Sequence, residues 1–116
     1  MNKKLKNLIK LSSKVKILIP STIDINKDFD NSKQVDNALT LFSNCFGGAT
    51  SFLAVGAWQS QNEGLVKEKV IAVESFCNQQ QLEDKIETII DFCESLKIEM
   101  KQEAISLFVN NELYFI

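Results

Sequence analysis

Apolar residues recur at helical spacing in the segment that follows Ser32. They return every three or four positions from Val35 to Phe46, which predicts a helix with one apolar face. Ser32 is expected to cap the first turn of this helix, because its side-chain oxygen can accept a hydrogen bond from an unpaired N–H group there. Gly47 and Gly48 are expected to end the helix, since the position after a helix commonly takes a left-handed conformation that suits glycine.

A second, longer stretch has the same periodicity. Its apolar residues run from Leu82 to Met100 in steps of three and four, with Glu and Lys between them, which predicts another amphipathic helix. Other segments are rich in β-branched and aromatic residues and are bounded by turn residues, so they predict strands. In chain order these strands are Val15–Ile19, Thr50–Gln59, Val66–Phe76, Ala104–Val109 and Glu112–Ile116.

The connections fix the order of these elements. Pro20 ends the first strand because it has no backbone N–H, and the polar segment 21–31 is expected to be a loop. The segment 60–64 predicts a hairpin loop, and Asn110-Asn111 predicts a two-residue turn because Asn tolerates positive φ. The order β-α-β-β-α-β, with an extra C-terminal strand, predicts an α+β, ferredoxin-like domain with both helices on one face of an antiparallel sheet.

Several of the predicted strands are apolar on both faces, although the face away from the helices normally meets water. Because monomers seldom expose a large apolar patch, something should cover this second face. We expect a homodimer built on it, with Leu53 and Val55 near the centre, or the alternating set of Phe52, Ala54 and Trp58 if that one faces outward. The basic N-terminal arm or a foreign partner are the other candidates to cover it.

The charge of the chain is unevenly distributed. Six Lys and no acid lie in the first 16 residues, whereas the remaining 100 residues hold seven Lys and fifteen acids, which together give the net charge of −2. We therefore expect a basic arm at residues 1–14 and a single acidic domain at residues 15–116, with no direct binding to nucleic acid. No segment has the length of a secretion signal or a membrane span, so we expect a cytoplasmic protein with no membrane partner.

The absence of His and Arg limits the catalytic and ligand-binding sites that the chain can form. All 13 basic residues are Lys, and without His and Arg the chain has no imidazole base, no Cys/His zinc site and no guanidinium fork. The three cysteines are widely spaced and are expected to be free thiols, Cys45 and Cys93 buried on their helices and Cys77 the most exposed. We expect no cofactor, no metal and no catalytic residue, and hence a protein that is not an enzyme.

Short motifs carry a resemblance. Phe46-Gly47-Gly48-Ala49-Thr50 follows a helix, where the dipole disfavours anions, so it predicts a helix end and not a phosphate loop. With Gly56-Ala57-Trp58, Val66-Lys67-Glu68 and Gln102-Glu103-Ala104, it resembles a group of short uncharacterised proteins of phages, plasmids and mobile elements in low-GC bacteria. The resemblance implies no activity; it implies a setting in which small proteins often inhibit host defence complexes, anti-CRISPR proteins among them.

Two functions remain open at this stage. The first is a non-enzymatic interaction module that occludes the basic groove of a host defence complex with the carboxylates of the second helix, together with the strand residues Leu53, Val55 and Trp58. Those carboxylates are Glu83, Asp84, Glu87, Asp91 and Glu94.

The alternative is a small-molecule-binding protein or small enzyme of the dimeric ferredoxin-like barrel type. Its pocket would lie between sheet and helices near Trp58. Phe42, Phe46 and Phe52 would line this pocket, with Glu68 or Glu74 as its ionisable groups.

Overall fold

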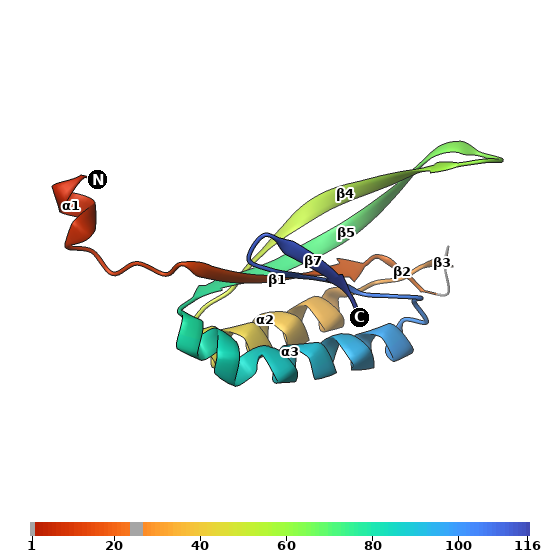
Figure 1. Cartoon of the computed structure of the whole chain (residues 1–116). Helices are drawn as coiled ribbons and strands as arrows, with labels where there is room; N and C mark the ends of the chain where they lie inside the picture. Colours follow the sequence, from red (N-terminus) through yellow and green to blue (C-terminus); the bar gives the residue numbers. More distant parts are fainter. Residues whose placement is uncertain (1, 24–26) are drawn as a thin grey trace.

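The chain forms an antiparallel sheet of five strands with two long helices on one of its faces, as a computed structural model shows (Figure 1). The structure describes residues 2–23 and 27–116. In chain order the elements are α1 (Lys3–Lys6), β1 (Ser13–Pro20), β2 (Thr22–Ile23), β3 (Lys27–Asp28), α2 (Ser32–Phe46), β4 (Thr50–Ser60), β5 (Gly64–Cys77), α3 (Gln79–Glu99), β6 (Ser106–Val109) and β7 (Glu112–Phe115).

The strand order confirms the predicted fold class. The sheet reads β4-β5-β1-β6-β7, and every neighbouring pair is antiparallel. The first strand of the β-α-β-β-α-β unit therefore lies between β5 and β6, as in a ferredoxin-like sheet. The additional C-terminal strand β7 pairs with β6 and forms one edge, and β4 forms the other.

Two local predictions at the start of α2 need correction. The segment 21–31 is not simply a loop, because β2 and β3 pair within it; its residues 24–26 lie outside the described residues. Ser32 is the first residue of α2 and not its cap, since Asn31 occupies the N-cap position. The Asn31 side chain donates to the carbonyl of Pro20 (2.8 Å), while the Asp30 carboxylate accepts from the Ser32 backbone N–H (3.0 Å).

The predicted chain reversals are confirmed. Gly47 has φ of 92° and its N–H donates to the carbonyl of Ser43, which ends α2. Asn110 has φ of 56° in the turn between β6 and β7. The hairpin between β4 and β5 closes with Ser60 paired to Gly64, as expected.

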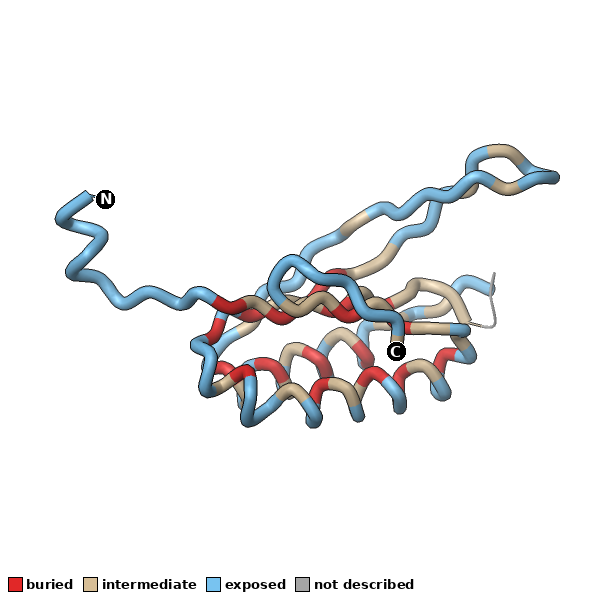
Figure 2. Tube along the Cα trace, in the orientation of Figure 1, coloured by how far each residue is buried: buried red, intermediate tan, exposed pale blue. Residues whose placement is uncertain are grey.

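The core lies between the sheet and the helices. Along β1 the side chains alternate, so Val15, Ile17 and Ile19 face the helices and are fully buried. Figure 2 shows buried positions along β1 and along the inner sides of α2 and α3. The register aligns these β1 residues with Val73 and Ile71 of β5, which point to the same side.

No helix of residues 2–23 and 27–116 covers the other face of the sheet, which we call the open face. Its exposed large apolar residues, placed there by the strand register, are Phe52, Trp58, Phe76, Leu113 and Phe115. The prediction that strands would be apolar on both faces is therefore confirmed.

Leu53 and Val55 do not lie on the open face. Leu53 pairs with Ile71, which pairs with Ile19 of the core side, so the expectation that Leu53 and Val55 face away from the helices is wrong. Both side chains are nevertheless exposed, because the β4–β5 hairpin extends beyond the helices (Figure 1). The outward set is Phe52, Ala54 and Trp58, the alternative that the sequence left open.

The N-terminal arm does not cover either face. Every residue from Asn2 to Ser12 is exposed, and the arm projects away from the sheet (Figure 2). The lysines of β1 just after it behave differently. Lys14 lies 3.8 Å from the Glu74 carboxylate, and the Lys16 ammonium lies 4.4 Å from the centre of the Phe108 ring, so both cover part of the open face.

Candidate functional site

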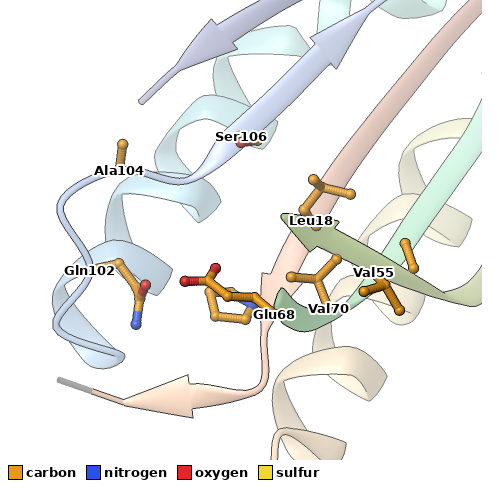
Figure 3. Close-up of a pocket in the computed structure, with 10 residues that line it drawn as sticks. Leu18, Val55, Glu68, Val70, Gln102, Ala104 and Ser106 are labelled. Atoms are coloured by element: carbon orange, nitrogen blue, oxygen red, sulfur yellow. The ribbon is translucent and has the colours of Figure 1, made fainter. Parts of the chain in front are cut away.

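A pocket lies on the open face of the sheet, where the central strand β1 ends. β1 stops at Pro20, the paired strands β4 and β5 extend beyond it, and the chain re-enters the sheet only at Ser106. The space between these segments forms a pocket of about 260 Å³ (Figure 3). Its lining residues are Leu18, Pro20, Ala54, Val55, Gly56, Glu68, Val70, Gln102, Ala104 and Ser106.

The pocket combines an apolar wall with few polar groups. Leu18 and Val70 project from neighbouring strands and form the apolar side. Glu68 is the one ionisable residue in the lining, among the residues that the structure describes, and its carboxylate points across the pocket toward Gln102 (Figure 3). A few polar groups on an apolar wall are typical of small-molecule sites.

The end of α3 positions Gln102. Lys101 has a left-handed φ of 53°, and its N–H donates to the carbonyl of Ile98, while the N–H of Gln102 donates to that of Lys97 (3.0 Å). These two bonds form a Schellman motif, which turns the chain from the helix toward the sheet. The Gln102 amide nitrogen then donates to the carbonyls of Thr22 and Met100, each at 3.1 Å, so the side chain is held in place.

A neighbouring hollow extends the pocket toward solvent. It has a volume of about 230 Å³, and it shares Glu68, Gln102 and Ala104 with the first pocket while adding Lys101 and Glu103. The mouth of the site therefore offers both an ammonium group and carboxylates. This combination suits a zwitterionic ligand, because each of its charges can meet an opposite charge.

The pocket predicted near Trp58 is not the one found. Phe42 and Phe46 lie in the core, where their rings pack edge to face with centroids 6.0 Å apart. Phe52 and Trp58 project from the opposite side of the sheet, so these four side chains cannot line one cavity. Of the two carboxylates proposed for the site, Glu68 lines the observed pocket.

Of the interaction candidates predicted from the sequence, Val55 lines the pocket, and the helix carboxylates do not gather there. Glu74 pairs with Lys14 further along β5. The five carboxylates of the second predicted helix, Glu83 through Glu94, are exposed on α3, which covers the other face of the sheet.

The cysteines are not suited to act as nucleophiles. Cys77 is fully buried, so the expectation that it is the most exposed thiol is wrong; Cys45 is half-buried. Burial raises the pKa of Cys45 and Cys77, and burial with the nearby Glu94 carboxylate raises the pKa of Cys93 to about 12. The thiols therefore stay protonated at neutral pH.

Residues 2–23 and 27–116 contain no group of three or more His, Cys, Asp or Glu side chains placed to hold a metal ion. No helix among these residues is long and apolar enough to cross a membrane.

Sequence reasoning missed most of the pocket. Leu18 and Ser106 belong to no motif. Gln102 is part of the Gln102-Glu103-Ala104 string of the resemblance, but the string assigns it no role. These residues meet only because β1 is shorter than β5 and because α3 ends in a left-handed turn. Two residues of the lining, Glu68 and Val55, are among the candidates predicted from the sequence, Glu68 as an ionisable group of a pocket and Val55 as an interaction residue.

Solved structures share this architecture. A phage SAM lyase in complex with S-methyl-5′-thioadenosine matches with a TM-score of 0.65 at 14% identity, over 95% of this chain and 92% of that chain. A phage SAM lyase in its apo state matches with a TM-score of 0.66 at 15% identity, over 95% of both chains. The chain has the fold of a phage SAM lyase. No family model matches the sequence, and no curated protein does.

These structures correct the expectation that the protein is not an enzyme. The matching chains are enzymes, and they match over nearly their full length. The missing His and Arg exclude imidazole and guanidinium chemistry but not catalysis as such. The structural neighbours are phage proteins. The resemblance of this sequence to proteins of phages and plasmids stays a prediction.

Proposed function

We propose that the protein is an enzyme that binds S-adenosylmethionine in the open-face pocket and releases S-methyl-5′-thioadenosine. The observation that carries this proposal is the pocket itself, in which a single carboxylate lies opposite an apolar wall. The fold match over 95% of the chain supports it, since the matching proteins are SAM lyases and one of them holds S-methyl-5′-thioadenosine.

The reaction breaks the bond between the sulfonium sulfur and the γ-carbon of the amino-acid chain. The electron pair of that bond goes to sulfur, which becomes the neutral thioether of S-methyl-5′-thioadenosine. In one balanced route the substrate's own carboxylate oxygen attacks the γ-carbon and closes a lactone, so no proton moves. This route needs neither a general acid nor a general base, and it therefore suits a chain without His.

The apolar wall favours this step. Positive charge on sulfur disappears as the bond breaks, so the transition state carries less charge there than the substrate does. Side chains such as Leu18 and Val70 disfavour the charged substrate more than the transition state. The barrier falls accordingly when the sulfonium lies against them.

Glu68 would then bind the ammonium group of the substrate and not its sulfonium. The ammonium keeps its charge throughout the reaction, so a carboxylate paired with it holds the substrate without opposing the loss of charge at sulfur. Lys101, at the mouth of the site, is placed to attract the substrate carboxylate over a longer range.

A role against host defence remains part of this proposal, in a changed form. Occlusion of a basic groove would need the exposed carboxylates of α3, which lie on the side of the sheet opposite the pocket. An enzyme that consumes a methyl donor would instead act on a host defence system by depleting that small molecule. The acidic face of α3 is then free to serve another contact.

The test separates substrate binding from product binding. Glu68→Gln should raise KM for S-adenosylmethionine at least tenfold, because a charged hydrogen bond to the ammonium is lost. S-methyl-5′-thioadenosine lacks that ammonium, so its inhibition constant should change less than twofold. Glu74→Gln is the matched control, a carboxylate of the same strand and the same face outside the pocket, and it should leave both constants unchanged. Equal losses in the two variants would contradict the assignment of Glu68.

A further inference from the structure

An apolar groove runs between α3 and the edge strand β7, on the helical side of the sheet and away from the pocket. It has a volume of about 180 Å³, and it is lined by Ile86, Ile90, Leu107, Val109, Tyr114 and Ile116. It forms because β7 extends the sheet past α3. Its lining is almost entirely apolar, so a polar ligand gains little there and an apolar segment gains much.

Carboxylates border this groove along α3. Glu83, Glu87 and Glu94 are three, four or seven residues from Ile86 or Ile90, so they lie on the neighbouring stripe of the helix and are exposed. Glu112 of β7 is on the same face of its strand as Tyr114, one of the lining residues. Lys97 lies at the far end of the stripe, so the negative charge is concentrated toward the N-terminal part of α3.

The N-terminal arm has the complementary properties. Leu5, Leu8 and Ile9 are spaced as on one side of a helical turn, and they are 61%, 64% and 96% exposed. Lys3, Lys4, Lys6 and Lys10 lie between and around them, and the arm contains no acid. The exposed apolar side chains of this short segment favour its burial against another surface.

We propose that the N-terminal arm of a second copy of the chain occupies this groove. The apolar side chains of the arm would lie on Ile86 and Ile90, and its lysines would meet Glu83 and Glu87 at the rim. We assign the arm to a second copy because in this structure it leaves β1 and extends away from its own body (Figure 1). A reciprocal exchange of arms also closes a two-fold dimer, in which each copy gives and receives the same contact.

This contact is independent of the proposed lyase activity. The groove and the pocket lie on opposite faces of the sheet, and their lining residues differ. A variant of the arm or of the groove should therefore leave the reaction at the pocket of each copy intact, and a variant of Glu68 should leave the arm contact intact.

The test measures self-association of the full chain by analytical ultracentrifugation at 50 mM salt. We expect a dimer whose dissociation constant rises at least tenfold when residues 2–11 are deleted. It should also rise at least tenfold in the full-length chain that carries both Glu83→Lys and Glu87→Lys. The control is Asp84→Lys with Asp91→Lys. It makes the same change of charge on the outward side of α3, further from the groove, and should change the constant less than twofold. Adding Lys3→Glu and Lys6→Glu to the Glu83/Glu87 variant should restore association.

Three results would overturn the proposal. One is a wild-type chain that is monomeric at 100 μM. Another is equal weakening by the two pairs of α3 substitutions, which would reduce the effect to net charge. The third is an arm deletion that lowers the melting temperature but not the mass, because it would place the arm on its own groove. Circular dichroism of the deletion variant checks that the body, which holds the whole core, remains folded.

Discussion

Lys101 is the residue whose backbone does most to shape the candidate site. It holds a left-handed φ of 53° at the position after α3 where glycine is the usual residue. That turn brings Gln102 to the pocket, where its amide is fixed by the carbonyls of Thr22 and Met100. A lysine in the left-handed region lowers the free energy of unfolding relative to glycine. The same residue places a charged side chain at the mouth of the site.

Replacing Lys101 by glycine should therefore stabilise the fold. We expect Lys101→Gly to raise the free energy of unfolding by about 0.5–1 kcal/mol, because glycine adopts the same φ without the clash of a Cβ. Urea titration followed by circular dichroism measures this. Lys97→Gly, inside α3, is the control and should lower the free energy of unfolding by about 1 kcal/mol. A loss of stability in both variants would show that the left-handed turn carries no strain.

At the scale of the elements, local sequence patterns predicted the two long helices, the strands of the five-stranded sheet and their turns, but not β2 and β3. The two long helices, the hairpin and the two-residue turn at Asn110 each rest on residues within one segment, and each is present. Predictions failed where distant segments decide. Ser32 is not a cap because Asn31 bonds Pro20, and Leu53 faces the helical side because of its register with Ile71. The pocket likewise depends on where β1, β5 and α3 end relative to one another, which no local pattern encodes.

The first turn of α3 is fastened by a capping box. The Asn78 side chain accepts from the N–H of Gln81 (2.8 Å), and the Gln81 side chain accepts from the N–H of Asn78 (2.9 Å). Asn78→Ala should lower the free energy of unfolding by about 1 kcal/mol, since it leaves a helical N–H without its partner. Asn62→Ala, at the exposed tip of the hairpin, should change it by less than about 0.5 kcal/mol. Thermal and urea denaturation of both variants would contradict the capping role if the two effects were equal.

At the scale of the whole molecule, the open face of the sheet needs a partner that covers its apolar side chains. It leaves Phe52, Trp58 and Leu113 partly exposed, although monomers seldom expose a large apolar patch. We propose that a second copy covers this face, as the two-sided apolar strands suggested. The arm contact would join the same two copies by passing around the β7 edge.

Light scattering tests this pairing. At tens of micromolar the chain should have a mass of about 26 kDa, twice 13.1 kDa. Phe52→Asp should shift the mass toward 13 kDa, because it would bury an unpaired carboxylate between the two open faces. Leu53→Asp, the next residue on the opposite side of β4, is the control and should leave the dimer intact. If Leu53→Asp alone dissociated the dimer, the partner would lie on the helical side instead.

The most direct test of the central claim is to incubate the unmodified protein with S-adenosylmethionine and quantify the products by liquid chromatography and mass spectrometry. We expect S-methyl-5′-thioadenosine and homoserine lactone to appear in equal amounts, at a rate proportional to protein concentration and well above spontaneous breakdown. Glu68→Gln should slow this at subsaturating substrate. Breakdown at the spontaneous rate in the presence of folded wild-type protein would contradict the proposed function.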